Sequence, residues 1–153
     1  VSVGEHDHVR PALDSLGVEQ VFWGVALRPG KPTYFGVAPG GALVFGLPGN
    51  PVSAMVTFIL FARPALLAMQ GADPVATRVR ARFTERYEKV SGRAEAIRVR
   101  LAAGEGGWTA TPTGPQGSHV LTSMLGADGL AFAPTGETVV RAGEPIEVEL
   151  LRG

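Results

Sequence analysis

Cysteine is absent from the 153-residue chain. Its absence excludes disulfides, thiolate catalysis and Cys-ligated zinc or iron–sulfur centres. Neither sign of charge is in excess, because 14 basic residues balance 14 acidic ones and the formal net charge is +0. Without a bulk field, attraction to nucleic acid or to an anionic membrane surface is not expected. Any anion site must therefore be local.

A long uninterrupted apolar run is also lacking. The longest apolar segment, residues 52–69, contains polar residues and Pro64, so we predict a buried core helix there and no membrane span. The first residues do not combine a basic region with an apolar stretch, so no signal peptide is indicated and a cytoplasmic location is expected. Val1-Ser-Val-Gly4 resembles the end of a strand whose beginning is missing, which favours a C-terminal piece of a longer protein.

Apolar residues and turn formers are abundant. Hydrophobic residues make up 45% of the sequence and charged residues 18%, a composition that forms a packed core and argues against disorder. The 21 glycines and 12 prolines predict frequent tight turns. The length fits one domain or two small ones.

The first half of the chain alternates helix and strand patterns, as is typical of an α/β layer. Pro39-Gly-Gly41 predicts a hairpin turn, and Arg63-Pro64 is expected to kink or split a long helix. The predicted elements are a helix over 9–16, a strand over 20–27, hairpin strands over 33–37 and 42–45, and a helix over 51–69.

Strand patterns dominate the second half. Period-two alternation and Gly-rich turns predict a small β-barrel or sandwich, with one helical turn within residues 119–125. Gly71-Ala-Asp-Pro74 breaks the pattern, so we place a boundary between an α/β part, residues 1–72, and an all-β part, residues 73–153. The predicted strands cover residues 78–83, 97–101, 108–111, 130–133 and 145–151.

The strongest local signal is Gly46-Leu-Pro48-Gly49-Asn50-Pro51-Val-Ser53. Asn50 is a good N-cap, and Pro51 suits the first helical position. The first helical turn then offers free N–H groups to an anion, and Ser53 would add a hydroxyl. An ordinary capped helix start is the alternative, and helix starts are far more common than anion sites.

A second motif, Arg28-Pro-Gly-Lys31-Pro32, presents two cations on a loop that its prolines make stiff. Such a pair loses little entropy when it binds phosphate or another oxyanion. We expect the strands ending near Leu27 and Phe45 to be neighbours in one sheet, so that Arg28, Lys31 and Ser53 converge on one pocket. A solvated turn is the alternative.

Gly4-Glu5-His6-Asp7-His8 places two acids and two imidazoles near the N-terminus. A carboxylate there could hold Mg²⁺ beside phosphates. A His/Asp zinc site matches no standard spacing, and an acidic first helical turn explains the same residues.

Two later loops, Ser91-Gly-Arg93 and Gln116-Gly-Ser118-His119, carry donors that an anion could use, although both are also ordinary turns. Alternating arginines mark strands of the second half and are expected to form a solvated sheet face. RNA binding on that face is the alternative, which the lack of interleaved aromatic residues disfavours. These arginines are Arg78, Arg80, Arg82, Arg98 and Arg100.

Taken together, these motifs resemble the molybdopterin molybdotransferase family: the bacterial MoeA proteins, the gephyrin E domain and their plant counterparts. Three strings occur in the family's order: Val1-Ser-Val-Gly-Glu-x-Asp7, Arg28-Pro-Gly-Lys-Pro32, and Gly46-Leu-Pro-Gly-Asn-Pro-Val-Ser53. Gly92-Arg93, Gln116-Gly-Ser118 and Ala127-Asp-Gly-Leu130 also fit, so the likeness runs over nearly the whole chain.

The resemblance implies an enzyme of molybdenum cofactor biosynthesis. Such a protein inserts molybdate into adenylylated molybdopterin and releases AMP, with Mg²⁺ assisting. Members of the family are elongated homodimers. Residues 1–72 would be the second part of an α/β molybdopterin-binding domain, and residues 73–153 a C-terminal β-barrel domain.

By the same resemblance, each motif supplies site residues. Asp7 would be catalytic and a metal ligand, and Lys31 catalytic and oxyanion-binding. The molybdopterin-binding loop would comprise Pro48, Gly49, Asn50 and Pro51. The other oxyanion-binding residues would be Arg28, Ser53, Arg93 and Ser118, with Ser123 the alternative to Ser118.

Two departures from the family pattern stand out. Arg28 replaces the usual lysine, so a planar guanidinium with several N–H donors takes the place of a compact ammonium group. The family's preceding domains and the first half of its α/β domain have no counterpart in these 153 residues, so we do not expect this chain to catalyse the reaction alone. A non-catalytic scaffold or binding module related to the gephyrin E domain is the alternative function.

Overall fold

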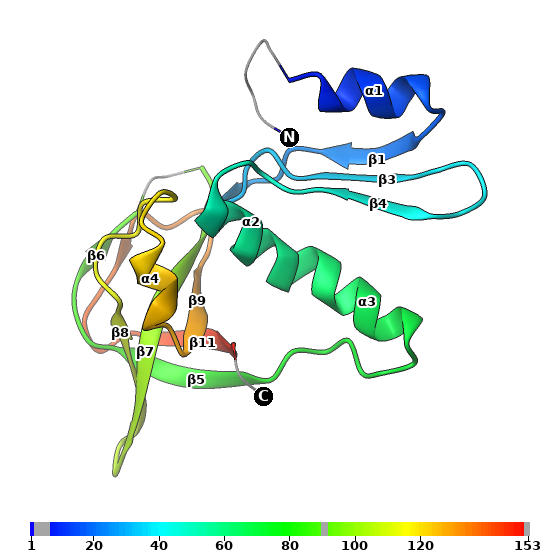
Figure 1. Ribbon diagram of the computed structural model, residues 1–153. Coiled ribbons are helices and arrows are strands. Elements are labelled where there is room, and N and C mark those ends of the chain that lie inside the picture. Colours follow the sequence, from blue (N-terminus) through cyan, green and yellow to red (C-terminus); the bar gives the residue numbers. More distant parts are fainter. Residues whose placement is uncertain (2–6, 90–91, 152–153) are drawn as a thin grey trace.

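The computed structural model describes residues 1, 7–89 and 92–151. Its first part contains short strands followed by one long helical run (Figure 1). The elements are α1 (Val9–Ser15), β1 (Glu19–Trp23), β2 (Leu27–Arg28), β3 (Tyr34–Val37), β4 (Leu43–Gly46), α2 (Pro51–Thr57), the π-helix η1 (Phe58–Ala62) and α3 (Arg63–Met69).

Strands β1, β3 and β4 form an antiparallel sheet in the order β1-β3-β4. The predicted hairpin is confirmed, since Gly40 and Gly41 both adopt φ +89 in the β3–β4 turn. Helix α1 covers one side of this sheet, and the run α2-η1-α3 lies on the other (Figure 1). The guanidinium of Arg10 lies 4.3 Å from the ring centroid of Trp23, which docks α1 on β1.

The single strand predicted over residues 20–27 is two strands. Gly24 has φ +82 and follows the last residue of β1. The chain then leaves the small sheet, and β2 pairs in parallel with a strand of the second part, with Leu27 opposite Ala94 and Arg28 opposite Glu95. The expectation that the strands ending near Leu27 and Phe45 are sheet neighbours is therefore wrong, because β2 belongs to a different sheet.

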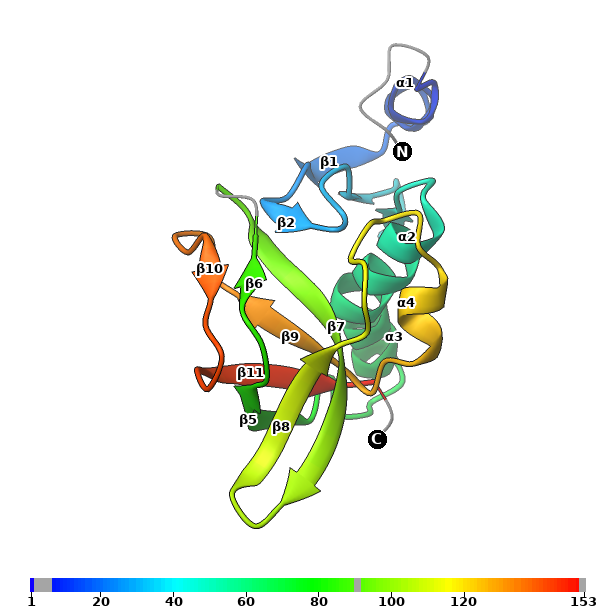
Figure 2. The same ribbon diagram turned by 90° about the vertical axis from the view of Figure 1, so that its left-hand side faces the viewer.

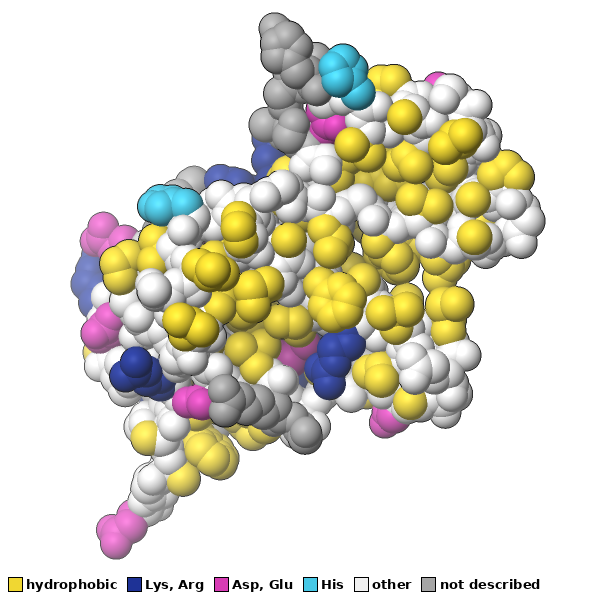
Figure 3. All heavy atoms as spheres, in the orientation of Figure 1, with side chains coloured by type: hydrophobic (Ala, Val, Ile, Leu, Met, Phe, Trp, Pro, Cys, Tyr) yellow, Lys and Arg dark blue, Asp and Glu magenta, His cyan; other side chains and the backbone are white. Residues whose placement is uncertain are grey.

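The helical run is continuous, with a π turn directly before Arg63-Pro64. Proline removes a hydrogen bond and crowds the preceding helical turn, and the wider π turn accommodates both effects. By length and composition, residues 51–69 are apolar enough to span a membrane. Only one face of this helix is buried, through residues such as Val52 and Val56. The opposite face exposes apolar side chains (Figure 3), namely Met55, Phe58, Leu66 and Met69.

The second part contains a closed barrel of five strands in the order β7-β8-β5-β11-β9, completed by pairing of β7 with β9. The barrel and the helical turn are confirmed, and the two-residue pair β6–β10 was not predicted. The elements are β5 (Arg78–Phe83), β6 (Tyr87–Glu88), β7 (Ala94–Gly104), β8 (Gly107–Pro112), α4 (Thr122–Leu125), β9 (Gly129–Ala133), β10 (Val139–Val140) and β11 (Pro145–Leu150).

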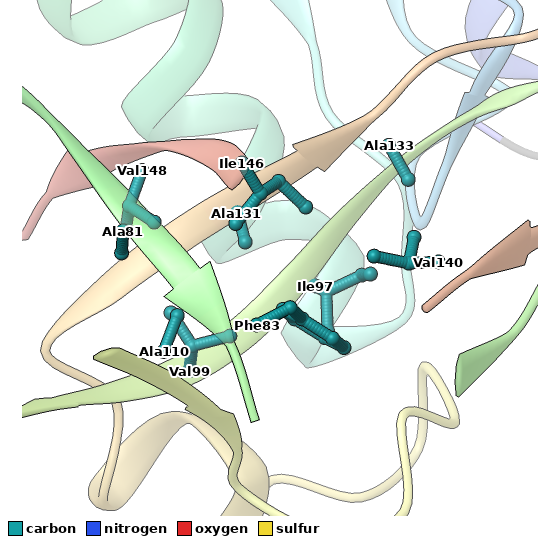
Figure 4. Close-up of a cluster of buried hydrophobic side chains, with 10 residues drawn as sticks. All are labelled: Ala81, Phe83, Ile97, Val99, Ala110, Ala131, Ala133, Val140, Ile146 and Val148. Atoms are coloured by element: carbon teal, nitrogen blue, oxygen red, sulfur yellow. The ribbon is translucent and has the colours of Figure 1, made fainter. Parts of the chain in front are cut away.

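Two apolar clusters hold the molecule together. One fills the barrel and includes Phe83, Ile97 and Val99 (Figure 4). The other lies where the barrel meets the long helix, and joins Leu27, Val52 and Val56 of the first part to Ala96, Met124 and Leu130 of the second. The two parts thus share buried surface, while the division between residues 72 and 73 stays a prediction.

Candidate oxyanion site

The β2–β3 loop carries Lys31 on a well-defined backbone. Pro29 and Gly30 are buried, whereas Lys31 is exposed. The Thr33 hydroxyl donates to the Gly30 carbonyl at 2.6 Å, and the Val25 amide donates to the Lys31 carbonyl at 2.9 Å. The backbone at Lys31 is therefore held by hydrogen bonds, while the Lys31 side chain is exposed to solvent.

Lys31 and Arg93 line the same hollow, whose volume is about 540 Å³. These two cations come from distant parts of the sequence and were both predicted as oxyanion-binding residues. The described lining contains no acid, so a local positive field faces the hollow. The remaining described lining residues are Gly24, Val25, Ala26 and Gly92.

Arg28 has a different partner. Its Nη1 lies 3.4 Å from Oε1 of Glu95, a carboxylate whose side chain is 1% exposed. Ser53 is buried on α2. Neither Arg28 nor Ser53 is among the described residues that line the Lys31 hollow, so the predicted convergence of Arg28, Lys31 and Ser53 on one pocket is not what the structure shows.

The predicted tight loop before α2 is confirmed, and Asn50 is the N-cap with Pro51 at the first helical position. The Asn50 side chain, however, makes no capping hydrogen bond. Its Nδ2 donates to the Ser118 hydroxyl at 3.1 Å, and its Oδ1 is buried without a protein partner. Within this loop Pro48 is buried and Gly49 exposed. Asn50 thus links the predicted molybdopterin-binding loop to the barrel.

Ser118 and Ser123 occupy different surroundings. Ser123 is buried, donates to the Val120 carbonyl at 2.6 Å and accepts from Arg98 Nε at 3.2 Å. The loop that carries Ser118 is held against β7 by Gln116, whose side chain bonds both the amide and the carbonyl of Arg98. Ser123 is thus held by internal hydrogen bonds on α4, whereas Ser118 bonds Asn50 of the α2 loop, and the assignment of either serine to the oxyanion stays a prediction.

Arg98 contradicts the expectation of a solvated arginine face. It is fully buried, and its guanidinium contacts Ser123, the Ala96 carbonyl and the Gly117 carbonyl. Burial lowers the pKa of Arg98 below its ordinary value. Helix α4, through Ser123, and the loop at Gln116 and Gly117 cover the side of β7 that carries Arg98, so the alternating pattern does not mark a solvated face there. The other four arginines, Arg78, Arg80, Arg82 and Arg100, are exposed.

Glu95, Tyr87 and Lys89 were missed by sequence reasoning. The Tyr87 hydroxyl donates to Glu95 Oε1 at 2.7 Å. The pKa of Tyr87 is raised above its ordinary value, chiefly because the group is buried and secondly because of this hydrogen bond. A signal for Glu95 existed, because it shares the β7 face of Ile97 and Val99, where a charge is unexpected. Lys89 is one of only two lysines in the chain, the other being Lys31, whereas nothing in the sequence distinguished Tyr87.

Asp7 lies just before α1, where its Oδ1 accepts the Val9 amide hydrogen bond at 3.0 Å. Glu5 and His6 lie outside the described residues. Within the described ranges, no group of three or more acidic or histidine residues is close enough to hold a metal ion. Magnesium usually retains several waters and uses one or two carboxylates together with substrate phosphates, so Asp7 fits as a single ligand and not as a complete site.

Comparison with known proteins finds two family models that match in succession. Residues 1–68 match the model described as a probable molybdopterin binding domain, and residues 80–151 match the MoeA C-terminal region (domain IV). The gap between the two matches contains the boundary suggested by the sequence.

Relatives match across the whole chain. A molybdopterin molybdenumtransferase of Synechococcus elongatus is 38% identical over 99% of this chain and 36% of its own length. The molybdenum cofactor synthesis protein cinnamon of Drosophila melanogaster is 34% identical over 99% of this chain and 26% of its own. A crystal structure of a molybdopterin biosynthesis moea protein from Pyrococcus horikosii has a TM-score of 0.77 at 35% identity, covering 94% of this chain and 34% of that one. The chain thus spans about a third of the length of such relatives.

Proposed function

The chain belongs to the molybdopterin molybdenumtransferase (MoeA) family, and we propose that it serves molybdenum cofactor biosynthesis by forming part of the site that inserts molybdate into adenylylated molybdopterin. Insertion would release AMP. The chain supplies a segment of this site, and the longer relatives have further sequence beyond the matched segment.

One observation carries the proposal: Lys31 and Arg93 line one hollow whose described lining has no acid. Molybdate is a tetrahedral dianion, and two neighbouring cations suit it. Lys31 offers a point charge on an exposed, backbone-held loop, and Arg93 offers a planar fork with several N–H donors. Because hydrogen bonds already hold the backbone at both residues, the anion has only the two side chains to order, which limits the entropy lost on binding.

The loop before α2 would bind the pterin substrate. Pro48, Gly49, Asn50 and Pro51 form its backbone, and Asn50 reaches Ser118 across to the barrel. The buried Asn50 Oδ1 has no protein partner, and buried acceptors are normally satisfied. A donor on the pterin would meet this need, which would join the substrate to both the α2 loop and the Ser118 loop.

Mg²⁺ would assist through charge neutralisation of the phosphate that leaves with AMP. Asp7 is the described residue we assign to it, together with oxygens of the substrate. Its Oδ1 accepts the Val9 amide hydrogen bond at 3.0 Å, which places the carboxylate just before α1.

We also propose that the whole protein is a cytoplasmic homodimer that uses neither nucleic acid nor a membrane. This part of the proposal rests on the family resemblance. Light scattering on the full-length protein and fractionation of cells that express it are the direct measurements.

Calorimetric titration of the chain with molybdate tests the anion site, with sulfate as a competing tetrahedral dianion. We expect Arg93→Ala to weaken molybdate binding by about 30- to 150-fold, which corresponds to loss of one charge-assisted contact of about 2–3 kcal/mol. Arg82→Ala, which removes an exposed arginine from β5, is the matched control and should leave the affinity unchanged. Equal molybdate affinity in the wild type and Arg93→Ala would remove Arg93 from the site.

A further inference from the structure

The Arg28–Glu95 ion pair lies beside the Lys31 hollow, and its carboxylate is buried. Glu95 has a side chain that is 1% exposed, and Oε1 receives both Arg28 at 3.4 Å and the Tyr87 hydroxyl at 2.7 Å. Oε2 is buried without a protein partner. A buried carboxylate is costly unless it is paired, so the Arg28 guanidinium is held in place by the charge it neutralises.

This ion pair fixes the start of the loop that carries Lys31. Arg28 is the last residue of β2 and lies directly opposite Glu95 in the parallel pairing with β7. Figure 2 shows β2 near the first residues of β7. The Ala94 amide also donates to the Ala26 carbonyl at 2.8 Å. Backbone and side chain of Arg28 are thus both attached to the first residues of β7, and Lys31 follows only three positions later.

The same loop is also packed against α2, at the residue directly before Lys31. Gly30 has φ +122, and a Cβ at this position would collide with the Thr57 Cγ2 methyl group. The close approach leaves the loop no room to shift toward the helix. Arg28 is held at the barrel and Gly30 lies against α2. These two separate contacts fix the backbone that leads into Lys31.

Arg93, on the other side of the hollow, is held from the same part of the barrel. The buried Lys89 ammonium donates to the Arg93 carbonyl at 2.8 Å and to the Glu137 carbonyl at 2.6 Å. Lys89 directly follows β6, whose Tyr87 bonds Glu95. The two cations are therefore positioned by neighbouring residues of one polar cluster.

We propose that Glu95 is a positioning residue that holds Lys31 at its distance from Arg93 by fixing Arg28, and that Arg28 is the partner of Glu95 and not a direct ligand of the anion. The effect of this positioning on anion affinity rests on the oxyanion binding proposed above. The geometry itself, a loop fixed by Glu95, is independent of which ligand binds.

The direction of the change in molybdate affinity distinguishes a positioning role of Glu95 from a purely electrostatic one. Removing the negative charge of Glu95 next to an anion site should strengthen anion binding if only charge matters. If Glu95 positions the loop, Glu95→Gln should weaken molybdate binding by about tenfold, because the anion must then order a mobile Lys31 side chain and its backbone. Glu149→Gln is a matched control, since the Glu149 carboxylate is also buried and paired with an arginine, Arg78 at 3.3 Å.

Hydrogen exchange gives a readout that needs no ligand. We expect Glu95→Gln to speed amide exchange in residues 24–33, while Glu149→Gln leaves that segment unchanged even if it lowers the melting temperature equally. Unchanged exchange in residues 24–33 of Glu95→Gln overturns the positioning role whatever the anion does. Faster exchange in a chain that binds no molybdate keeps the positioning role and rejects the proposed function.

A double-mutant cycle tests the second half of the proposal. If Arg28 acts through Glu95, then Arg28→Met with Glu95→Gln should bind molybdate no more weakly than Glu95→Gln alone. If Arg28 contacts the anion, the two losses multiply, and Arg28 returns to the ligand set. Arg28→Lys keeps the charge opposite Glu95 and should restore the affinity to within about threefold of the wild type.

Discussion

The side-chain amide of Asn50 donates a hydrogen bond to the hydroxyl of Ser118 across 68 positions of sequence, at 3.1 Å. Asn50 begins the long helix and Ser118 belongs to a barrel loop, so this bond joins two motifs that the sequence presents separately. The Asn50 Oδ1, which is the atom that would accept a capping hydrogen bond, has no protein partner, and the side chain does not cap its own helix.

The Asn50–Ser118 bond should appear as a coupling energy in unfolding experiments. We expect Asn50→Ala and Ser118→Ala each to lower the free energy of unfolding by about 1 kcal/mol, with a coupling of about 0.5–1 kcal/mol in the double mutant. Urea denaturation of the four proteins measures it. Ser15→Ala, at an exposed serine of α1, is the control, and purely additive losses would show that the bond contributes nothing.

Replacing Lys31 with alanine should abolish molybdate insertion and leave the fold intact, because the side chain is exposed on a loop held by backbone hydrogen bonds. Loss of a contact to a dianion should weaken binding by about 30- to 150-fold. The measurement is molybdate-dependent cofactor formation by the protein that carries this chain, with thermal melting in parallel. Full activity of Lys31→Ala would mean that the loop is only a turn.

Arg98 should be a stability residue. Arg98→Ala removes a fully buried side chain and leaves Ser123 and two carbonyls without their partner, so we expect a loss of about 2–4 kcal/mol in the free energy of unfolding. Arg80→Ala, at an exposed position of β5, should cost less than about 0.5 kcal/mol. Similar losses for the two arginines would contradict the burial argument.

Stability should fall in alkaline solution because of Tyr87. Its folded-state pKa is raised above the ordinary value of about 10, so above that pH the unfolded chain releases the phenolic proton while the folded chain keeps it. The stabilisation is complete below pH 10 and is lost as pH rises, with a slope of at most about 1.4 kcal/mol per pH unit. Urea midpoints from pH 9 to 11 measure it, and Tyr87→Phe should flatten this part of the profile.

Several elements were predictable because one physical rule determines each of them. Strand β5 was predicted with its observed bounds, since arginines alternate with residues that face the barrel interior. The β3–β4 hairpin followed from consecutive glycines, and the start of α2 from Asn50-Pro51. In each case the pattern that determines the element lies within a few consecutive residues, so it can be recognised from the sequence.

The failures involve contacts between distant segments. Alternation could not reveal that α4 and the loop at Gln116 and Gly117 bury Arg98 on β7. The two-residue strands β6 and β10 are too short to have a period. The sequence placed Arg28 beside Lys31, but it could not reveal the Arg28–Glu95 ion pair, because that contact depends on the pairing of β2 with β7.

Strand β7 has consequences for how much sequence change the barrel tolerates. Residues 95–99 are buried without interruption, whereas β5 alternates between exposed and covered positions. In a scan of all single substitutions, β5 should therefore show a tolerant position at every second residue, and β7 should show a solid block of five intolerant ones. Because that block contains Glu95 and Arg98 as well as apolar residues, the part of the barrel with the least freedom to vary is also the part to which the Lys31 loop and the Ser118 loop are attached.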